Sequence, residues 1–196
     1  MKIKDLIISH IKKKGQINVG EFIELCQFSE NGYYINNNPI GQNNDFITSP
    51  EISQMFGEII GVYLINFWEK NIQRDFNLIE LGPGAGTLTE DIIRVATINK
   101  DFLNSTNLFL IEKNQVLIKK QKDRLSNLNV KKLKWCKNFD IKNDKPSIVY
   151  SNEFFDCFPV RQFFKKKVWF EKFIKYNNSA KLFNFVPEEI KNDKLL

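Results

Sequence analysis

The chain has 196 residues, is 42% hydrophobic and 13% aromatic, and carries a formal net charge of +6. This apolar content suffices for one packed domain, and the modest net charge argues against intrinsic disorder. The lysines are scattered along the whole sequence, which is typical of a solvated surface and disfavours a nucleic-acid-binding protein. A single histidine and three widely spaced cysteines, Cys26, Cys136 and Cys157, argue against a His/Cys metal site and are expected to be reduced, buried thiols.

The N-terminal part predicts helices joined by a long loop. Apolar spacing predicts an amphipathic helix over 3–14, and Asn18 with Glu21 has the spacing of a capping box that opens a second helix. The long Asn-, Gly- and Pro-rich stretch that follows is expected to be mobile or a binding element. Ser49 is then expected to cap a helix that has Pro50 at its first position and runs to about residue 68. Its predicted apolar face consists of Ile52, Phe56, Ile59, Ile60, Tyr63, Leu64 and Phe67.

From Phe76 onward, predicted strands and helices alternate. Thr87 and Glu90 have capping-box spacing and are expected to open the first of these helices. This order predicts an α/β fold with a Rossmann-like parallel sheet, helices on both faces and right-handed crossovers. The predicted strands are 76–81, 107–112, 130–136 and 147–151, and the predicted helices are 87–98 and 116–128.

After Pro159, apolar and charged residues alternate around polar turns, which predicts antiparallel β-hairpins. We therefore expect three parts. They are N-terminal helices and a covering loop in 1–70, a nucleoside-binding core in 71–160, and a β-hairpin extension in 161–196.

The stretch FNLIELGPGAGTL gives the strongest functional signal. Gly82, Gly84 and Gly86 follow a predicted strand, where glycine permits a sharp turn and close backbone approach to a ligand. The spacing lacks the third glycine of a dinucleotide fingerprint and the lysine of a P-loop. Glu80 would repel a phosphate but suits a cationic ligand, and Glu112 at the next strand end is placed to bind ribose hydroxyls. Together they favour S-adenosylmethionine (SAM) over the alternative, a tight turn without a ligand.

A second cluster of polar residues follows the predicted 147–151 strand. Asn152, Glu153 and Asp156 are interleaved with phenylalanines at the edge of the sheet where ligands of open parallel sheets bind. A polar strand cap is the simpler interpretation. The mixture of aromatic and polar residues instead favours the pocket of the methyl acceptor.

Several motifs resemble the MidA family, whose members are class I SAM-dependent methyltransferases. The motifs are Gly32-Tyr33-Tyr34, DFITSPEISQMFGE (45–58), ELGPGAGTL (80–88), SNEFFDCFPV (151–160) and Trp169 with Glu171. The resemblance implies that mitochondrial members methylate an arginine of a respiratory complex I subunit during its assembly. It further implies that Phe46, Thr48 and Ser49 close over the cofactor, whose methionine end lies on the glycine loop.

For the acceptor, the resemblance suggests that Glu153, helped by Asp156, holds the guanidinium charge while Asn152 orients the group. Family members continue well beyond the length of this chain. We therefore expect an incomplete sheet, and a second polypeptide that completes the fold is one explanation. The expected compartment is the bacterial cytoplasm, or the mitochondrial matrix in a eukaryote, although no transit peptide and no membrane-inserted segment are recognised.

Two other functions remain open from the sequence. Asn152 followed by aromatic residues is similar to the signature of nucleic-acid base amino-methyltransferases, but the prolines of that signature are replaced by Glu153 and Phe154. The other alternative is a truncated, catalytically inactive module that binds a partner.

Overall fold

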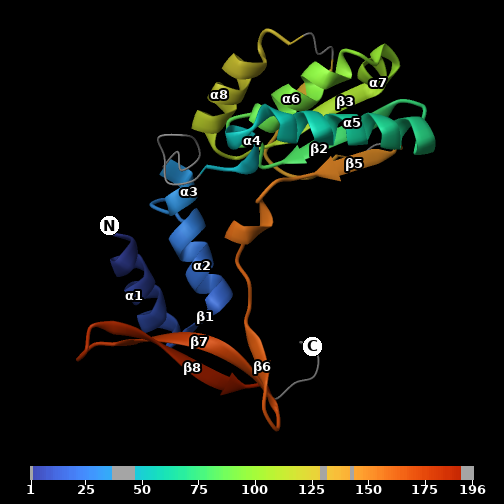
Figure 1. Ribbon diagram of the computed structural model, residues 1–196. Helices are drawn as coiled ribbons and strands as arrows, with labels where there is room; N and C mark the ends of the chain where they lie inside the picture. The colour runs from blue at the N-terminus through green and yellow to red at the C-terminus, as the bar shows by residue number, and fades with distance from the viewer. Residues whose placement is uncertain (1, 37–46, 129–131, 142–143, 191–196) are drawn as a thin grey trace. The chain divides into compact units, whose positions relative to one another are not determined.

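The computed structural model describes residues 2–36, 47–128, 132–141 and 144–190 (Figure 1). The chain divides into two compact units. Unit 1 combines Met1–Asn37 with Phe155–Leu196, and unit 2 is Asn38–Phe154. The predicted division into 1–70, 71–160 and 161–196 stays a prediction.

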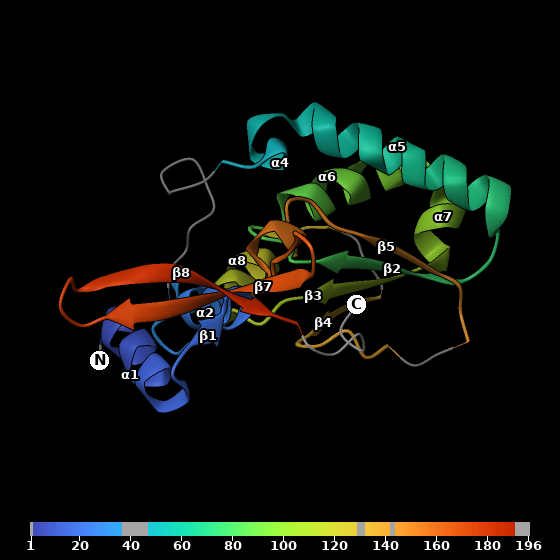
Figure 2. The same ribbon diagram turned by 90° about the horizontal axis from the view of Figure 1, so that it is seen from below.

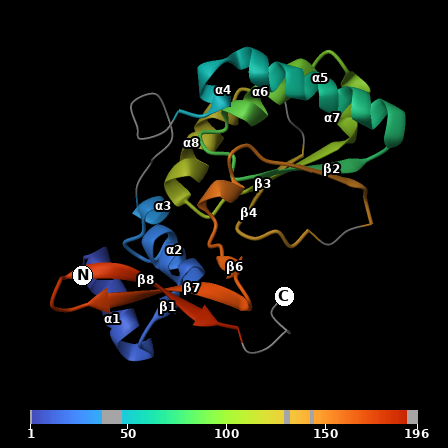
Figure 3. The same cartoon turned by 60° about the horizontal axis from the view of Figure 1, so that its bottom comes forward.

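Unit 1 pairs an antiparallel sheet with N-terminal helices (Figure 3). A small core of Ile7, Ile11, Ile17 and Ile174 joins the first helix to the sheet. The two hairpins predicted after Pro159 are confirmed. The helical elements are α1 (Ile3–Lys14), α2 (Val19–Phe28), α3 (Tyr33–Asn36) and a 3-10 turn, η1 (Phe155–Cys157). The strands are β1 (Ile17–Asn18), β6 (Phe163–Lys165), β7 (Trp169–Asn177) and β8 (Leu182–Glu189).

The predicted first helix and the predicted capping box of α2 are both confirmed. The side chain of Asn18 accepts the backbone N–H of Glu21 at 2.8 Å, and the side chain of Glu21 accepts the backbone N–H of Asn18 at 3.0 Å. In addition, β1 pairs with β7, so the start of the chain and its later hairpins share one sheet.

Unit 2 contains a parallel four-stranded sheet in the order β4-β3-β2-β5, which confirms the predicted α/β core. Its strands are β2 (Phe76–Leu81), β3 (Thr106–Ile111), β4 (Leu133–Cys136) and β5 (Ser147–Tyr150). Its helices are α4 (Ser49–Ile52), α5 (Gln54–Asn71), α6 (Thr87–Ala96), α7 (Lys100–Ser105) and α8 (Gln115–Leu125), of which α7 was not predicted. No described helix has both the length and the apolar character that crossing a membrane requires.

The helices of unit 2 cover one face of its sheet (Figure 1). Alternate strand residues such as Leu78 and Leu108 pack against helix residues such as Ile92 and Phe102 in one buried cluster. The expected helices on the second face are not found among the described residues, and the described part of the β4–β5 connection contains no helix. Parallel sheets are normally covered by helices on both faces. On this second face the central-strand residues Asn77 and Ile79 are buried, whereas Val149 of β5 is 45% exposed.

The buried face of α5 differs from the prediction. Glycines Gly57 and Gly61 are buried and let α5 approach α6 closely, and Figure 2 shows the two helices side by side. The predicted face is only partly buried, because its members Ile52, Ile59, Tyr63 and Phe67 are exposed. The apolar residues run around much of this helix, so tertiary packing and not the sequence pattern selects the buried side.

Adding a methyl group at Gly57 is expected to destabilise unit 2. The Cβ of alanine would lie 2.5 Å from the Cβ of Asp91, so α5 and α6 must move apart. Overpacking of this kind costs about 1–3 kcal/mol, which exceeds the gain in helix propensity of at most about 1 kcal/mol. Thermal unfolding should show a lower midpoint for Gly57→Ala. The control Asn66→Ala changes the exposed side of the same helix and should unfold at or slightly above the parent midpoint, because alanine favours the helix. Equal midpoints for both variants would contradict the packing argument.

Two predicted helix caps are wrong. The N-cap of α4 is Thr48 and not Ser49, and no side chain caps it. The N-cap of α6 is Gly86, so Thr87 and Glu90 form no capping box. Both side chains of this second pair make tertiary contacts instead. Thr87 donates a hydrogen bond to Glu51, and Glu90 accepts one from Arg124 at 2.7 Å.

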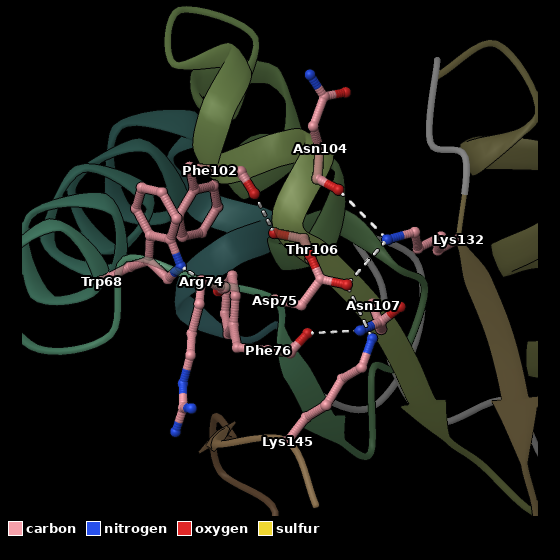
Figure 4. A network of polar contacts seen from close by, with 10 residues as sticks. All are labelled: Trp68, Arg74, Asp75, Phe76, Phe102, Asn104, Thr106, Asn107, Lys132 and Lys145. Atoms are coloured by element: carbon pink, nitrogen blue, oxygen red, sulfur yellow. Dashed lines mark hydrogen bonds and ion pairs between the residues drawn. The ribbon is translucent and has the colours of Figure 1, made fainter. Parts of the chain in front are cut away.

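Polar contacts tie the amino ends of the strands together (Figure 4). Asp75 pairs with Lys145 at 2.9 Å and with Lys132 at 3.7 Å, which links the residues before β2, β4 and β5. The side chain of Asn107 donates to the backbone oxygen of Phe76 at 2.9 Å and adds a bond between β2 and β3. This end of the sheet is therefore crosslinked, while the glycine loop lies at its carboxyl end.

Candidate functional site

A pocket opens at the carboxyl ends of β2 and β5. Glu80 of β2 and Asn152, two residues beyond β5, lie in its lining. The loop 82–85 and the first residues of α6 form another part of it, and Thr48, Pro50 and Glu51 at the start of α4 form the rest. The pocket therefore lies at the sheet edge where ligands of open parallel sheets bind.

The glycine loop has a backbone that side chains would disfavour. Gly82, Gly84 and Gly86 have φ angles of 64°, 57° and 86°. A Cβ on Gly82 would lie 2.3 Å from the ring of Phe154. The loop is anchored because the N–H of Gly82 donates to the backbone oxygen of Ile111 at 3.1 Å. Glycine is thus required here both for conformation and for space.

Glu80 is a buried acid in the lining of this pocket. It is 2% exposed, and its Oε2 accepts hydrogen bonds from Thr89 of α6 and from Tyr150 of β5, the latter at 3.2 Å. Burial raises the pKa of Glu80 to about 7, although both hydrogen bonds act in the opposite direction. Its charge is therefore costly without a cationic ligand.

A second acid, Glu51, was not predicted as a site residue. It lies in the lining of the pocket and accepts the hydroxyl of Thr87. An acid in the first turn of a helix is already explained by the helix dipole, and no sequence pattern marks it as a ligand contact. The lining thus carries two acids, while its described residues include no lysine, arginine or histidine. This charge pattern favours a cation over a phosphate.

Glu112 follows β3 and is held by its own turn. Its Oε1 accepts the backbone N–H groups of Lys113 at 2.8 Å and Asn114 at 2.9 Å, while burial raises its pKa. Buried Gln121 of α8 also hydrogen-bonds to Glu112 and donates to the backbone oxygen of Gly84 at 2.9 Å. Gln121 therefore connects the acid to the glycine loop, a link that the sequence analysis missed.

The structure places only part of the predicted site in the pocket lining. Glu80, Gly82, Gly84, Thr48 and Asn152 lie there together. Ser49, Gly86, Glu112 and Glu153 belong to the same unit but not to the lining. Glu153 is exposed and has a φ of 50°, so it forms a left-handed turn after β5. Asp156 lies in η1 of unit 1, and Phe46 is outside the described residues.

Comparison with known sequences identifies similar proteins over most of the chain. A family model described as "putative S-adenosyl-L-methionine-dependent methyltransferase" matches residues 59–195. The mitochondrial protein arginine methyltransferase NDUFAF7 of Mus musculus is 33% identical over 194 residues, which cover 87% of this chain and 44% of the mouse protein. The Xenopus laevis protein of the same name is 36% identical over 148 residues, or 74% of this chain and 32% of its own length. The chain therefore spans less than half the length of these relatives.

Two solved structures from Burkholderia thailandensis have a similar fold. One, with S-adenosyl-homocysteine bound, aligns with a TM-score of 0.81 at 19% identity and covers 98% of this chain and 51% of its own. The other, a native structure, aligns with a TM-score of 0.76 at 18% identity and covers 98% and 49%. At this identity the likeness supports the fold and leaves the ligand to be argued from the residues.

Proposed function

The chain belongs to the family of S-adenosyl-L-methionine-dependent methyltransferases, and on this premise we propose that it binds SAM at the glycine loop and serves methyl transfer to a protein arginine. The observation that carries the proposal is the pocket itself. In the pocket lining, Gly82 and Gly84 expose their backbone, and two acids, Glu51 and Glu80, lie beside them. The described lining contains no basic side chain. A nucleoside with a cationic amino-acid end satisfies both features.

The residues around the pocket fit the parts of this cofactor. Gly82, Gly84 and Gly86 would cradle the methionine end, where a Cβ at Gly82 would fill space close to Phe154. Glu80 would accept the α-ammonium group, and Glu112 would accept the ribose hydroxyls. Thr48 in the lining supports the proposal that it closes over the cofactor together with Ser49 and Phe46.

The acceptor is proposed from the names of the relatives, which are protein arginine methyltransferases. Bound SAM supplies an activated methyl group. Arginine is a poor nucleophile because its positive charge is delocalised and its pKa exceeds about 12. We propose that Glu153, with Asp156, concentrates this charge on one nitrogen and leaves another free to attack, while Asn152 orients the group. The family resemblance suggests a subunit of respiratory complex I as the substrate.

Glu153→Gln is expected to separate acceptor chemistry from cofactor binding. Loss of the carboxylate charge should lower turnover on an arginine substrate at least about tenfold, since one charge-assisted contact to the guanidinium is weakened. The dissociation constant for S-adenosyl-homocysteine should change less than about twofold, because Glu153 does not line the pocket. The control is Glu188→Gln, which removes an exposed carboxylate of β8 and should change neither turnover nor cofactor binding. Weakened cofactor binding by Glu153→Gln would remove this residue from the acceptor role.

A partner that completes the sheet is proposed from the edge of unit 2. In the described sheet β5 is an edge strand, and its Val149 is 45% exposed. The sheet lacks helices on one described face, and the relatives are more than twice as long as the aligned part. We infer that a polypeptide equivalent to the other half of the relatives pairs with β5 and covers this face.

Mixing the two halves tests this partner. The separately expressed remaining half of the mouse relative should form a complex with this chain, detected as a peak of summed mass in size-exclusion chromatography. Val149→Asp should weaken the complex, because a charge would be placed on the apolar edge. Separate elution of two folded halves would contradict the proposal and favour a chain that acts alone or is inactive.

The compartment is proposed from the relatives, which are mitochondrial proteins; the bacterial cytoplasm is the alternative.

Cofactor binding is the decisive test of the proposed function. Calorimetric titration of the full chain should show one site for SAM and S-adenosyl-homocysteine. ATP and NADH should not bind, since phosphates would face the two acids of the pocket. A folded chain that binds neither sulfur nucleoside at any pH would refute the proposal.

A further inference from the structure

Two hydroxyl groups from different elements contact the same oxygen of Glu80. Thr89 of α6 and Tyr150 of β5 both hydrogen-bond to Oε2, and their hydroxyl oxygens lie 3.4 Å apart. Thr89 has no exposed surface and Glu80 is 2% exposed. The described hydrogen bonds to this carboxyl group all fall on Oε2, so the contacts hold the group from one side.

The charged groups around Glu80 provide no positive partner. Across the pocket, α4 contributes Glu51, which is another acid. On α6, Asp91 is paired with Arg94 and lies against α5. On β5, the pKa of Tyr150 is raised well above its ordinary range, mainly by burial and in addition by the charge of Glu80. This phenol therefore stays neutral at physiological pH. Glu80 therefore has hydroxyl donors but no cation among these neighbours.

This inference rests on the proposed SAM site. We propose that Glu80, buried and without a cationic partner, bears a proton in the empty pocket, that Thr89 and Tyr150 are positioning residues which hold its carboxyl group and ease the loss of that proton, and that the cationic cofactor displaces it. In this step the carboxyl O–H bond breaks, the proton passes to solvent, and the electron pair stays on the carboxylate. The ammonium group of the ligand then provides the missing positive charge.

The balance of forces explains why the proton is displaced only on binding. Burial disfavours the carboxylate, and the two hydroxyl groups favour it, which leaves the pKa of Glu80 at about 7. A positive charge within hydrogen-bonding distance adds a further contribution that favours the carboxylate. The bound state is therefore ionised at a pH at which the empty state still holds its proton.

Proton displacement makes cofactor affinity depend on pH in a specific way. Below the pKa of Glu80, each binding event must release a proton, so affinity rises with pH; above it, affinity levels off. We expect a gain of about fivefold between pH 6 and pH 7 and little change between pH 7 and pH 8, where the gain from Glu80 is offset by the ligand's own loss of charge. The α-amino group of the ligand, with a pKa of about 8, loses its own charge above that pH and limits the range.

The experiment is calorimetric titration of the full chain with S-adenosyl-homocysteine at pH 6, 7 and 8. At each pH, two buffers with different ionisation enthalpies give the number of protons released. The expected net release is close to one proton at pH 6 and about half a proton at pH 7. At pH 8 it changes to a net uptake of about half a proton, because the ligand's amino group, with a pKa of about 8, must be protonated when it binds. Glu80→Gln, titrated with ligand above its weakened dissociation constant, should release no proton at pH 6 or pH 7.

Variants of the two hydroxyl groups give a readout that a purely structural role would not change. Tyr150→Phe and Thr89→Val each remove a donor to the carboxylate, so the midpoint of the affinity curve should move to higher pH by about one unit. Thr89→Ser should restore the parent midpoint. Thr106→Val is the matched control, because it removes another buried threonine hydroxyl group of unit 2, whose 2.7 Å bond goes to the backbone oxygen of Phe102.

The possible outcomes separate this inference from the proposed function. Proton release with a midpoint that moves in the hydroxyl variants, but not in Thr106→Val, supports the inference. Tight binding of S-adenosyl-homocysteine without proton release or pH dependence between pH 6 and 7 overturns it and leaves the SAM site intact. Absence of binding at every pH overturns both. If a valine or phenylalanine variant does not fold, proton release by the parent at pH 6 and its decline at pH 7 still decide the question.

Discussion

Replacing Glu80 with glutamine is expected to stabilise the cofactor-free protein above pH 7 and to abolish tight cofactor binding. In the folded chain burial raises the pKa of this carboxyl group to about 7, from an ordinary value of 4.5. Between these two values the unfolded chain has lost the proton that the folded chain still holds, so stability falls as pH rises. The loss is complete above pH 7 and amounts to about 3 kcal/mol at most.

The neutral amide of Glu80→Gln removes this loss. The variant should match the parent in stability at pH 4 and exceed it at pH 8 by about 2–3 kcal/mol. The hydroxyl groups of Thr89 and Tyr150 can serve as hydrogen-bond partners of the amide. Chemical denaturation at pH 4, 6 and 8 measures the difference. A constant difference at all three values would mean that the ionisation of Glu80 is not the cause.

The same substitution should weaken S-adenosyl-homocysteine binding at pH 8 by at least about 100-fold, since an amide cannot balance the ammonium charge in a buried site. The opposite signs of the two effects are the useful feature. A residue kept for folding would show a loss of stability when replaced. A residue that serves the ligand carries a cost in the empty protein, as strained or unpaired groups at functional sites do.

The glycine loop could be predicted from sequence because its properties are local. A strand that ends in Glu80 and continues through three glycines specifies both a sharp turn and an open backbone, and the φ angles of Gly82, Gly84 and Gly86 agree. The parallel sheet could be predicted equally well, since the alternation of strands and helices along the sequence constrains how the strands are connected.

The rest of the site depends on contacts between distant positions. Tyr150 hydrogen-bonds to Thr89 across 61 positions of sequence, and Gln121 bonds to Gly84 across 37. Tyrosine in a strand and glutamine in a helix are ordinary residues, so no local pattern marks either of them. Glu51 was missed for the same reason, because an acid in the first turn of a helix already has a local explanation. Three-dimensional placement alone distinguishes these residues.

The buried side of α5 illustrates a different limit. Apolar residues such as Ile59 and Tyr63 satisfy helical spacing as well as the buried Leu64 does, and yet they are exposed. The choice is made by Gly57 and Gly61, whose missing side chains allow α5 to lie against α6. Hydrophobic periodicity detects a helix, but it does not identify the buried face when the faces differ little in apolar content.

Gly82→Ala is expected to impair cofactor binding and folding together. Two effects add at this position: a φ of 64° disfavours any Cβ, and that Cβ would lie 2.3 Å from the ring of Phe154. The left-handed backbone alone costs about 1–2 kcal/mol, and the collision forces the loop or the ring to move. Displacement of the loop should weaken S-adenosyl-homocysteine binding at least about tenfold, because the backbone could no longer approach the ligand closely.

Gly15→Ala separates the two contributions to the Gly82→Ala effect. Gly15 has a φ of 83° but no atom within 4 Å of a built Cβ, so its substitution measures backbone strain without a collision. The double variant Gly82→Ala/Phe154→Ala removes the collision and keeps the strain. If crowding dominates, thermal unfolding and calorimetry should show that the double variant recovers part of the binding lost in Gly82→Ala, as a coupling energy between neighbouring sites. Equal stability losses for Gly15→Ala and Gly82→Ala, with no coupling to Phe154, would reduce the requirement for glycine to backbone conformation alone.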